Sequence, residues 1–150
     1  NNNLFMAYSH VAHDCQVGSY VVVANCSALA GHVTVEDRVT IGGLSGIHQF
    51  TKVGKLAMIG GCTKIVKDVP PFIIADGNPA RVAGINIVGL RRTDAPPDVR
   101  NEIKRACRIL YRSNLSIEQA IEKMEHELKS IAEIDHFIRF LRSTDRGICR

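Results

Sequence analysis

The chain has 150 residues, of which 45% are hydrophobic and 23% are charged, and its formal net charge is +4. This composition is typical of a folded globular protein, and the positive charge is too small and too dispersed to predict a nucleic-acid partner. No apolar run reaches the roughly 18 residues that a membrane-spanning helix needs, and the Asn-rich start does not resemble a signal peptide, so we expect a cytoplasmic protein without a transmembrane segment.

An aliphatic residue recurs every six positions in the first half of the chain. Ten consecutive hexads begin with Val11, Val17, Val23, Leu29, Val35, Ile41, Ile47, Val53, Ile59 and Ile65. Such a period predicts a triangular solenoid in which three hexads make one coil of about 18 residues. We therefore predict a left-handed parallel β-helix of hexapeptide repeats over residues 1–75, since solenoids of this type usually wind that way.

Two details of the repeat add to this prediction. The second position is mostly small and the fifth is small or β-branched, so we expect these positions to let the chain turn its corners. The repeat is already regular at Val11, with no capping segment before it. Because an open solenoid end exposes unpaired strand edges, we expect further coils upstream, so that this chain is a C-terminal portion truncated at its N-terminus.

The repeat ends at Pro70 and Pro71, because proline cannot donate a hydrogen bond to a strand ladder. A strong turn signal at 76–79 then predicts an irregular extension over residues 76–95. Residues 96–150 have helical periodicity and predict a small C-terminal α-helical domain, with helices near 97–112, after Ser116 and near 133–142. Ser116 and Gln119 have the spacing of a capping box at the start of the second of these helices.

The first predicted helix carries a stripe of basic residues. Lys104, Arg108 and Arg112 are spaced four apart and share one helix face, with Arg105 beside them and only Glu102 offsetting their charge nearby. An acidic protein could dock on this stripe. The alternative is a helix face that meets only water.

Residues that are 18 apart lie above one another if one coil has 18 residues. Two neighbouring columns then hold His13, Gly31 and Gln49, and Asp14, His32 and Phe50. His48 adjoins the first column, and His10 precedes it by three residues. The resulting cluster is expected to lie within about two coil heights, roughly 10 Å.

These residue types predict a particular chemistry. A neutral imidazole suits a general base near pH 7, so His13 could remove a proton from an acceptor hydroxyl. Asp14 would fix the tautomer of His13, and the amide of Gly31 could approach a reacting carbonyl closely. His32 would bind substrate hydroxyls. Because no serine or cysteine nucleophile adjoins a base, we expect direct attack by the acceptor rather than an acyl-enzyme.

A metal site is the alternative interpretation of the histidine cluster. Carboxylates and thiolates at typical ligand spacing are missing from the sequence around it, and the five cysteines include no C-x-x-C pair. We therefore expect no metal, no cofactor and no disulfide framework.

Two further glycines, Gly43 and Gly61, fall in one column above Asn25. Small residues in such a column either shape a corner or leave open the floor of a groove that takes an acyl chain. The sequence pattern alone does not separate these two interpretations.

Several motifs stand out beside the hexads: His10-Val11-Ala12-His13-Asp14, Ala30-Gly31-His32-Val33, His48-Gln49-Phe50, Asp68-Val69-Pro70-Pro71, Gly77-Asn78-Pro79-Ala80 and the segment 84–92. They resemble those of the UDP-N-acetylglucosamine O-acyltransferases, the family that begins lipid A synthesis. The resemblance covers essentially the whole chain. It implies a homotrimeric enzyme that transfers an (R)-3-hydroxyacyl group from acyl carrier protein to the 3-hydroxyl of UDP-N-acetylglucosamine.

The same resemblance implies a role for each matching residue. His13 looks like the general base, Asp14 like its supporting residue and Gly31 like the amide that stabilises the oxyanion. Substrate contacts are implied for His10, His32, His48, Gln49, Asn86 and Arg92. Gly61 looks like the position that sets acyl length, which places it with Gly43 in the acyl-chain groove and implies a long chain. The expected docking surface for acyl carrier protein is Lys104, Arg105, Arg108 and Arg112.

The chain departs from the family pattern in two places. The family draws an acidic and a basic substrate contact from upstream coils that this chain lacks, and Val88 stands where some members have an acidic residue. Two alternatives therefore stay open. One is another hexapeptide-repeat acyltransferase, acting on an amine or using coenzyme A, and the other is a truncated solenoid fragment without turnover.

Overall fold

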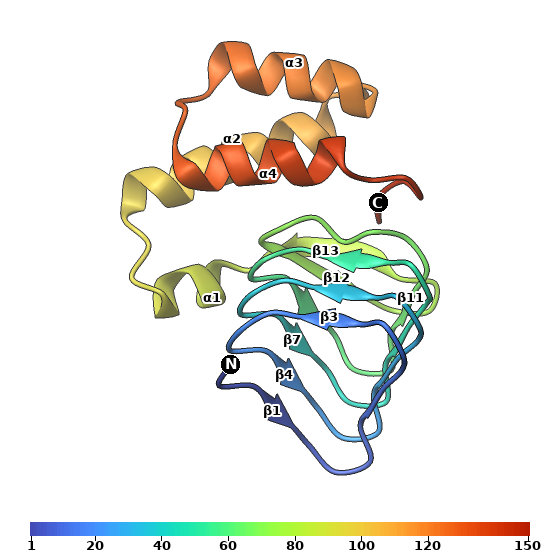
Figure 1. Ribbon diagram of the computed structural model, residues 1–150. Coiled ribbons are helices and arrows are strands. Elements are labelled where there is room, and N and C mark those ends of the chain that lie inside the picture. The colour runs from blue at the N-terminus through green and yellow to red at the C-terminus, as the bar shows by residue number, and fades with distance from the viewer. The chain divides into compact units, whose positions relative to one another are not determined.

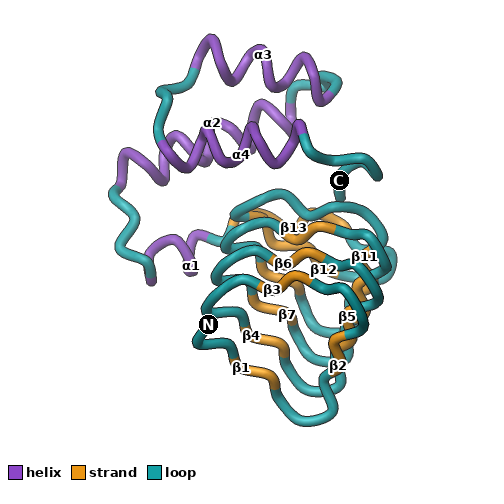
Figure 2. The backbone as a smooth tube through the Cα atoms, in the orientation of Figure 1, coloured by secondary structure: helices purple, strands orange, loops and turns teal.

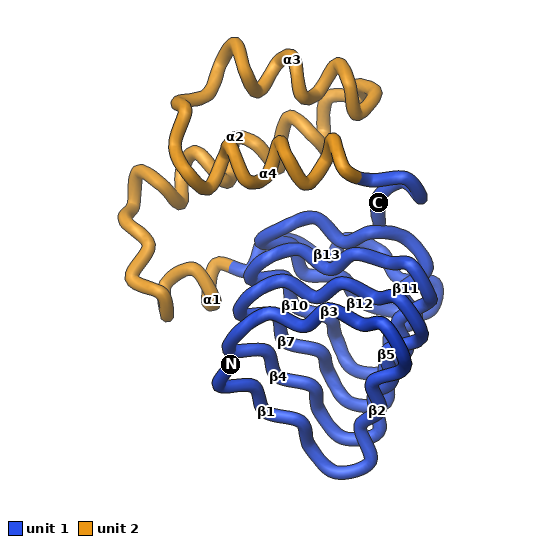
Figure 3. Tube along the Cα trace, in the orientation of Figure 1, with its two compact units in different colours: residues 1–86, 144–150 blue, residues 87–143 orange.

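The computed structural model describes all residues, 1–150, and its contacts divide the chain into two compact units (Figure 3). The solenoid unit comprises residues 1–86 together with 144–150, and the helical unit comprises residues 87–143. Each unit has its own buried core.

The first part of the solenoid unit is a series of short strands joined by tight turns (Figures 1 and 2). These strands are β1 (Leu4–Phe5), β2 (His10–Val11), β3 (Gln16–Val17), β4 (Val22–Val23), β5 (Ala28–Leu29), β6 (Thr34–Val35), β7 (Thr40–Ile41), β8 (Gly46–Ile47), β9 (Lys52–Val53), β10 (Met58–Ile59) and β11 (Lys64–Ile65). They build three parallel faces, with β1, β4, β7 and β10 in the first, β2, β5, β8 and β11 in the second, and β3, β6 and β9 in the third.

The strand register fixes the coil length at 18 residues. Leu4 pairs with Val22, and Val22 in turn pairs with Thr40. The other two faces have the same spacing, as in the pairing of His10 with Ala28. The predicted β-solenoid and its stacking distance in sequence are therefore confirmed.

Two positions of each hexad point into the core of the solenoid. First-position residues from Val23 to Ile65 are at most 2% exposed, and fifth-position residues from Val21 to Val69 are equally buried. Each buried aliphatic side chain contributes roughly 1.5–3 kcal/mol of transfer free energy. In one column the fifth residues are hydroxylic and form a ladder, in which Ser27 Oγ donates to Gly42 O at 2.7 Å and Ser45 Oγ donates to Gly60 O at 2.9 Å.

The corners of the solenoid are formed at the fourth hexad position, not at the small second and fifth positions that the sequence suggested. The fourth residue has a positive φ of about 60° in every turn from Asn2 to Cys62, and none of these residues is glycine. This backbone conformation costs a non-glycine residue about 1–2 kcal/mol. From Tyr20 onward this cost is offset by a hydrogen bond from the N–H of the same residue to the preceding coil, as where His32 N donates to His13 O at 3.0 Å.

The end of the solenoid is more regular than the sequence predicted. Strand β12 (Ile73–Asp76) continues the first face beside β10, and β13 (Arg81–Ile85) pairs antiparallel with β12. Residues 76–95, predicted as an irregular extension, thus contain a strand and, as described below, a helix. The antiparallel strand β13 forms hydrogen bonds with the edge of β12, which explains why the solenoid unit extends to Asn86.

The C-terminal residues return to the solenoid unit, whereas the sequence placed all of 96–150 in the helical domain. Asp68 N donates to Gly147 O at 3.1 Å, and Cys149 N donates to Asp68 O at 2.8 Å. The Asp68 carboxylate also accepts hydrogen bonds from Lys52 N at 2.8 Å and from Thr144 Oγ1 at 2.6 Å. These bonds, which join positions far apart in sequence, hold residues 144–150 against the solenoid.

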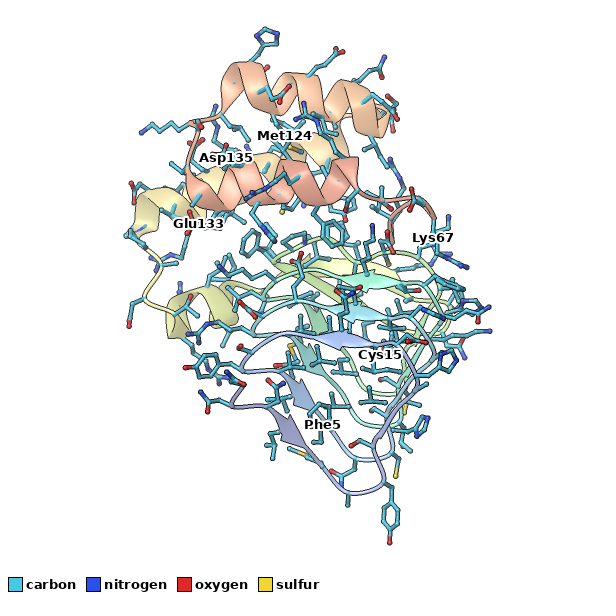
Figure 4. The ribbon with its side chains drawn as sticks, viewed as in Figure 1. Phe5, Cys15, Lys67, Met124, Glu133 and Asp135 are labelled. Carbon is cyan, nitrogen blue, oxygen red and sulfur yellow. The ribbon has the colours of Figure 1, made fainter.

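The helical unit contains four helices: α1 (Ile87–Arg92), α2 (Pro97–Arg112), α3 (Ile117–Glu127) and α4 (Ala132–Arg142). Helices α2, α3 and α4 pack on one another, and Met124, labelled in Figure 4, is fully buried among them. The predicted capping box is present, since Gln119 N donates to Ser116 Oγ at 3.2 Å and Ser116 N donates to Gln119 Oε1 at 3.0 Å. None of the helices combines the length and apolar composition needed to cross a bilayer.

Candidate functional site

One corner of the solenoid brings the predicted cluster together. His13 and Gly31 lie on consecutive coils, joined by the hydrogen bond from His32 N to His13 O at 3.0 Å. Gly31 and Gln49 follow in the same way, joined by the bond from Phe50 N to Gly31 O at 3.2 Å. The two predicted columns therefore stand side by side at the turn between the second and third faces.

His13 and Asp14 form a hydrogen-bonded pair on the surface of this corner. His13 Nδ1 lies 2.8 Å from Asp14 Oδ2, and His32 Nε2 lies 3.7 Å from the same oxygen. The hydrogen bond from His13, together with the nearby charge of His32, holds the pKa of the Asp14 carboxyl below its usual range. Asp14 is therefore ionised at neutral pH and can hold an imidazole in one orientation.

Aromatic contacts fix the ring of His32. It stacks on Phe50 with ring centroids 4.7 Å apart and an angle of 6° between the planes. It meets His13 edge to face, with centroids 5.0 Å apart. Phe50 was not among the predicted site residues, although its spacing of 18 from His32 was a usable signal.

Gly31 leaves room for the imidazole of His13. A Cβ at Gly31 would lie 2.7 Å from both Cε1 and Nε2 of that ring, so any side chain would displace it. The N–H of Gly31 donates no hydrogen bond within the chain. Gly31 itself is buried, and the exposed imidazole of His13 occupies the space where a side chain at Gly31 would lie.

Other polar groups surround this pair. His10 on β2 and His48 and Gln49 after β8 are exposed, and His48 Nδ1 lies 3.2 Å from Gln49 O. Cys15, labelled in Figure 4, follows Asp14 directly, but its Sγ donates to Ala30 O at 3.0 Å. The corner therefore presents imidazoles, an amide and a carboxylate to solvent.

Comparison with known proteins identifies the family. Residues 68–149 match the family model described as Udp N-acetylglucosamine O-acyltransferase, domain 2. The chain belongs to the UDP-N-acetylglucosamine O-acyltransferase family.

Individual members of this acyltransferase family are similar over nearly the whole chain. The acyl-[acyl-carrier-protein]–UDP-N-acetylglucosamine O-acyltransferase of Anaeromyxobacter sp. is 45% identical over 150 residues, which is 100% of this chain and 58% of the relative. The like-named protein of Gloeothece citriformis is 49% identical over 125 residues, 83% of this chain and 45% of the relative. The match thus covers only about half the length of each relative, 58% of the first and 45% of the second.

Solved structures of the family have the same fold. LpxA from Acinetobacter baumannii matches 100% of this chain and 58% of its own, with a TM-score of 0.97 and 42% identity. LpxA of Bacteroides fragilis, a UDP-N-acetylglucosamine acyltransferase, matches with a TM-score of 0.97 and 40% identity over 100% of this chain and 59% of its own.

In this acyltransferase-family chain, Gly43 and Gly61 lie at a different corner, between the first and second faces. A Cβ at Gly61 would meet only Gly43 O, at an ordinary 3.4 Å, and a Cβ at Gly43 would meet only Asn25 O, at 3.2 Å. The space beside these glycines is otherwise open. Their corner is reached from the His13 corner along the outer side of the face that contains β5 and β8.

The structure does not bring Asn86 to the histidine cluster of the same chain. Asn86 is 8% exposed, and its Nδ2 donates to Leu56 O at 2.9 Å, at the corner between the third and first faces. Arg92 is an exposed residue at the end of α1 in the helical unit. The sequence resemblance could not reveal this separation, because motifs carry no information about which corner a residue occupies.

Three of the four residues of the basic stripe have no acidic partner and are exposed on α2: Lys104, Arg108 and Arg112. Arg105 differs from them, since its guanidinium donates to Glu102 Oε1 at 2.7 Å and to Glu127 O at 2.9 Å. Arg105 therefore stabilises the helical unit, and the stripe available for docking consists of Lys104, Arg108 and Arg112.

Proposed function

We propose that this chain forms part of an enzyme that transfers an (R)-3-hydroxyacyl group from acyl carrier protein to the 3-hydroxyl of UDP-N-acetylglucosamine, the first step of lipid A biosynthesis. Family membership supports the reaction class. The observation that carries the proposal is the geometry of His13, which is held between the Asp14 carboxylate at 2.8 Å and the side-chain-free Gly31.

His13 acts as the general base in this proposal. The ionised Asp14 accepts the Nδ1 proton of His13, which leaves the Nε2 lone pair to take a proton from the sugar hydroxyl. The hydroxyl then attacks the thioester carbonyl directly, because no activated serine or cysteine is present at the corner. The proton on His13 passes to the leaving thiolate, so the reaction needs neither a metal nor a cofactor.

Gly31 stabilises the charge that develops on the thioester carbonyl. Its N–H has no acceptor within the chain, and Gly31 lies against the His13 ring, so this N–H can serve as the oxyanion-stabilising donor. His10, His32, His48 and Gln49 contact the substrates from the same corner. These exposed side chains can still form hydrogen bonds, which suits contacts with sugar hydroxyls.

The acyl chain occupies a groove that passes Gly43 and Gly61. The open space beside both glycines supports this placement, and the absence of a side chain at Gly61 favours a long acyl chain. The exposed cations Lys104, Arg108 and Arg112 attract the acidic carrier protein. Arg105 contributes little to this attraction, because its guanidinium is already bonded to Glu102 and Glu127.

The enzyme is a cytoplasmic homotrimer whose coils wind left-handed in this proposal. A trimer accounts for the separation of Asn86 from His13 within one chain, because each cleft would then combine His13 of one subunit with Asn86 of a neighbour. Cross-linking of the native protein, followed by mass measurement, tests the trimer directly.

The reaction is tested by assaying the natural full-length protein with each donor and acceptor. We expect turnover with 3-hydroxyacyl carrier protein and UDP-N-acetylglucosamine, and activity with acetyl coenzyme A alone would overturn the assignment. His13→Ala should lower turnover by about two to four orders of magnitude, the usual contribution of a general base. Its melting temperature should not change, because the His13 side chain is 71% exposed.

The acyl groove is tested with Gly61→Met, which fills the open space beside this glycine and should shift the preference toward shorter acyl chains. Ser19→Met is the matched control, since Ser19 holds the same hexad position at another corner. Unchanged chain selection by Gly61→Met would remove Gly61 from the groove.

A further inference from the structure

Three potential metal ligands converge at the His13 corner, a feature that the sequence spacing did not suggest. One ligand atom each from His13, Asp14 and His32 lies within 4.8 Å of the other two. The sequence predicted no metal site because no carboxylate lay at typical ligand spacing. The turn between β2 and β3 supplies that carboxylate, since an oxygen of Asp14 lies near a nitrogen of each imidazole.

We propose that this triad is a binding site for a divalent transition ion, Zn²⁺ in particular, and that the ion inhibits the enzyme rather than assisting it. The inhibition rests on the proposed function of His13, whereas the binding itself does not. Two imidazole nitrogens and one carboxylate oxygen are the ligands that Zn²⁺ prefers, and three protein ligands leave a fourth position for water.

Two of the three ligand separations are close to those around a zinc ion, and the third, between the two imidazole ligand atoms, is up to 4.8 Å and must shorten when the ion binds. Zinc bonds to nitrogen and oxygen of about 2.0–2.2 Å place neighbouring tetrahedral ligands roughly 3.3–3.5 Å apart. Asp14 Oδ2 and His32 Nε2 are 3.7 Å apart, close to this value. Asp14 Oδ2 and His13 Nδ1 are 2.8 Å apart, so they must separate by a few tenths of an ångström as the ion replaces the shared proton.

The surroundings of the triad favour binding. The side chains of His13 and Asp14 are 71% and 66% exposed, so an ion reaches them without any unfolding. The stacking of His32 on Phe50 holds one ligand ring in place before the ion arrives.

The bound ion would disable the general base. When Nδ1 of a neutral His13 bonds to the metal, the ring proton must reside on Nε2, so Nε2 has no lone pair left for the sugar hydroxyl. The ion also takes the Asp14 oxygen that orients His13. Zinc binding and catalysis are therefore mutually exclusive at this corner.

Binding is measured directly on metal-free protein by calorimetry with Zn²⁺ and by the visible absorption of Co²⁺. We expect one ion per chain and a Co²⁺ spectrum typical of four-coordinate geometry. Asp14→Asn and His32→Gln should each weaken binding roughly tenfold or more, at least as much as the loss of an outer-shell partner. His126→Gln, which alters an exposed histidine on α3, should bind as the wild type does.

Two results would overturn the site. One is the absence of stoichiometric binding by the wild type. The other is an equal loss of affinity in His48→Gln, which would place the ion on different histidines of the corner.

The inhibition is measured separately with the full-length enzyme. Zn²⁺ should abolish turnover with an inhibition constant equal to the measured dissociation constant, and a chelator should restore the rate. Stoichiometric binding by an inactive protein would refute the proposed function and leave the metal site intact. An active enzyme that binds no Zn²⁺, or that binds it without losing activity, would refute this inference and leave the proposed function intact.

Discussion

The two units of this protein obtain their structure in different ways. In the solenoid unit one pattern of contacts repeats every 18 residues, so each coil is held by the same kind of buried positions and backbone bonds. In the helical unit each contact occurs once, as in the bonds from Glu102 to Arg105 and Lys129. In the solenoid unit the outward-facing corner residues are not needed for folding and can serve a functional site. In the helical unit most apolar and several polar side chains form contacts that stabilise the unit.

Truncating the helical core gives the largest expected effect. Phe137 is completely buried, and Phe137→Ala should destabilise the helical unit by about 3–5 kcal/mol. Hydrogen exchange followed by mass spectrometry should show faster exchange in 97–142 and little change in the coils. An equal increase in the exchange rate in both units would contradict the division of the chain into two units.

The close stacking of coils is tested by a pair of glycines in the solenoid. A Cβ at Gly42 would lie 2.6 Å from Gly61 N, so Gly42→Ala should cost about 1–3 kcal/mol by forcing two backbones apart. Gly46→Ala is the matched control, because no atom lies within 4 Å of its Cβ position. Thermal unfolding of the two variants should differ clearly, and similar melting temperatures would contradict the close approach at Gly42.

The buried carboxylate of the helical unit links its stability to pH. Bonds from Lys129 N and from Arg105 hold the pKa of Glu102 below its ordinary 4.5, so its contribution is complete above that pH and is lost as pH falls through the lower folded pKa. Glu102→Gln should cost about 1–2 kcal/mol at pH 7. Denaturant unfolding should show this difference shrinking below about pH 4.5, where Glu102 of the unfolded chain is protonated. A difference that persists at low pH would indicate a packing effect instead.

The smallest expected effect is at the cap of α3. Ser116→Ala removes one acceptor of the capping box and should cost about 0.5–1 kcal/mol, in the lower part of the usual range because Ser116 is exposed. Ser116→Asp, which keeps an acceptor, is the control in the same thermal unfolding assay. A loss of stability in the Asp variant equal to that in the Ala variant would show that the cap contributes nothing.

Much of the site could be predicted from the sequence because the solenoid converts spacing into distance. The column of His13, Gly31 and Gln49 was predicted from the hexads alone. The stacking of Phe50 on His32 and the convergence of Asp14 on both imidazoles did not, because they depend on side-chain directions at the corner. The pairing of Arg105 with Glu102 was missed although their spacing of three residues on one helix was a usable signal, whereas the bond from Arg105 to Glu127 O depends on the tertiary structure.

The sequence by itself determined the repeat, the coil length and the helix α2, because periodic burial is a local property that each segment expresses independently. Only the tertiary structure decided which residue turns each corner. A positive φ at non-glycine residues is unfavourable locally, and from Tyr20 to Cys62 the N–H of each such residue donates to a carbonyl of the preceding coil. Tertiary structure also decided that residues 144–150 join the solenoid. Asp68 forms hydrogen bonds with residues of this segment that are more than seventy positions away in sequence, 76 in the case of Thr144.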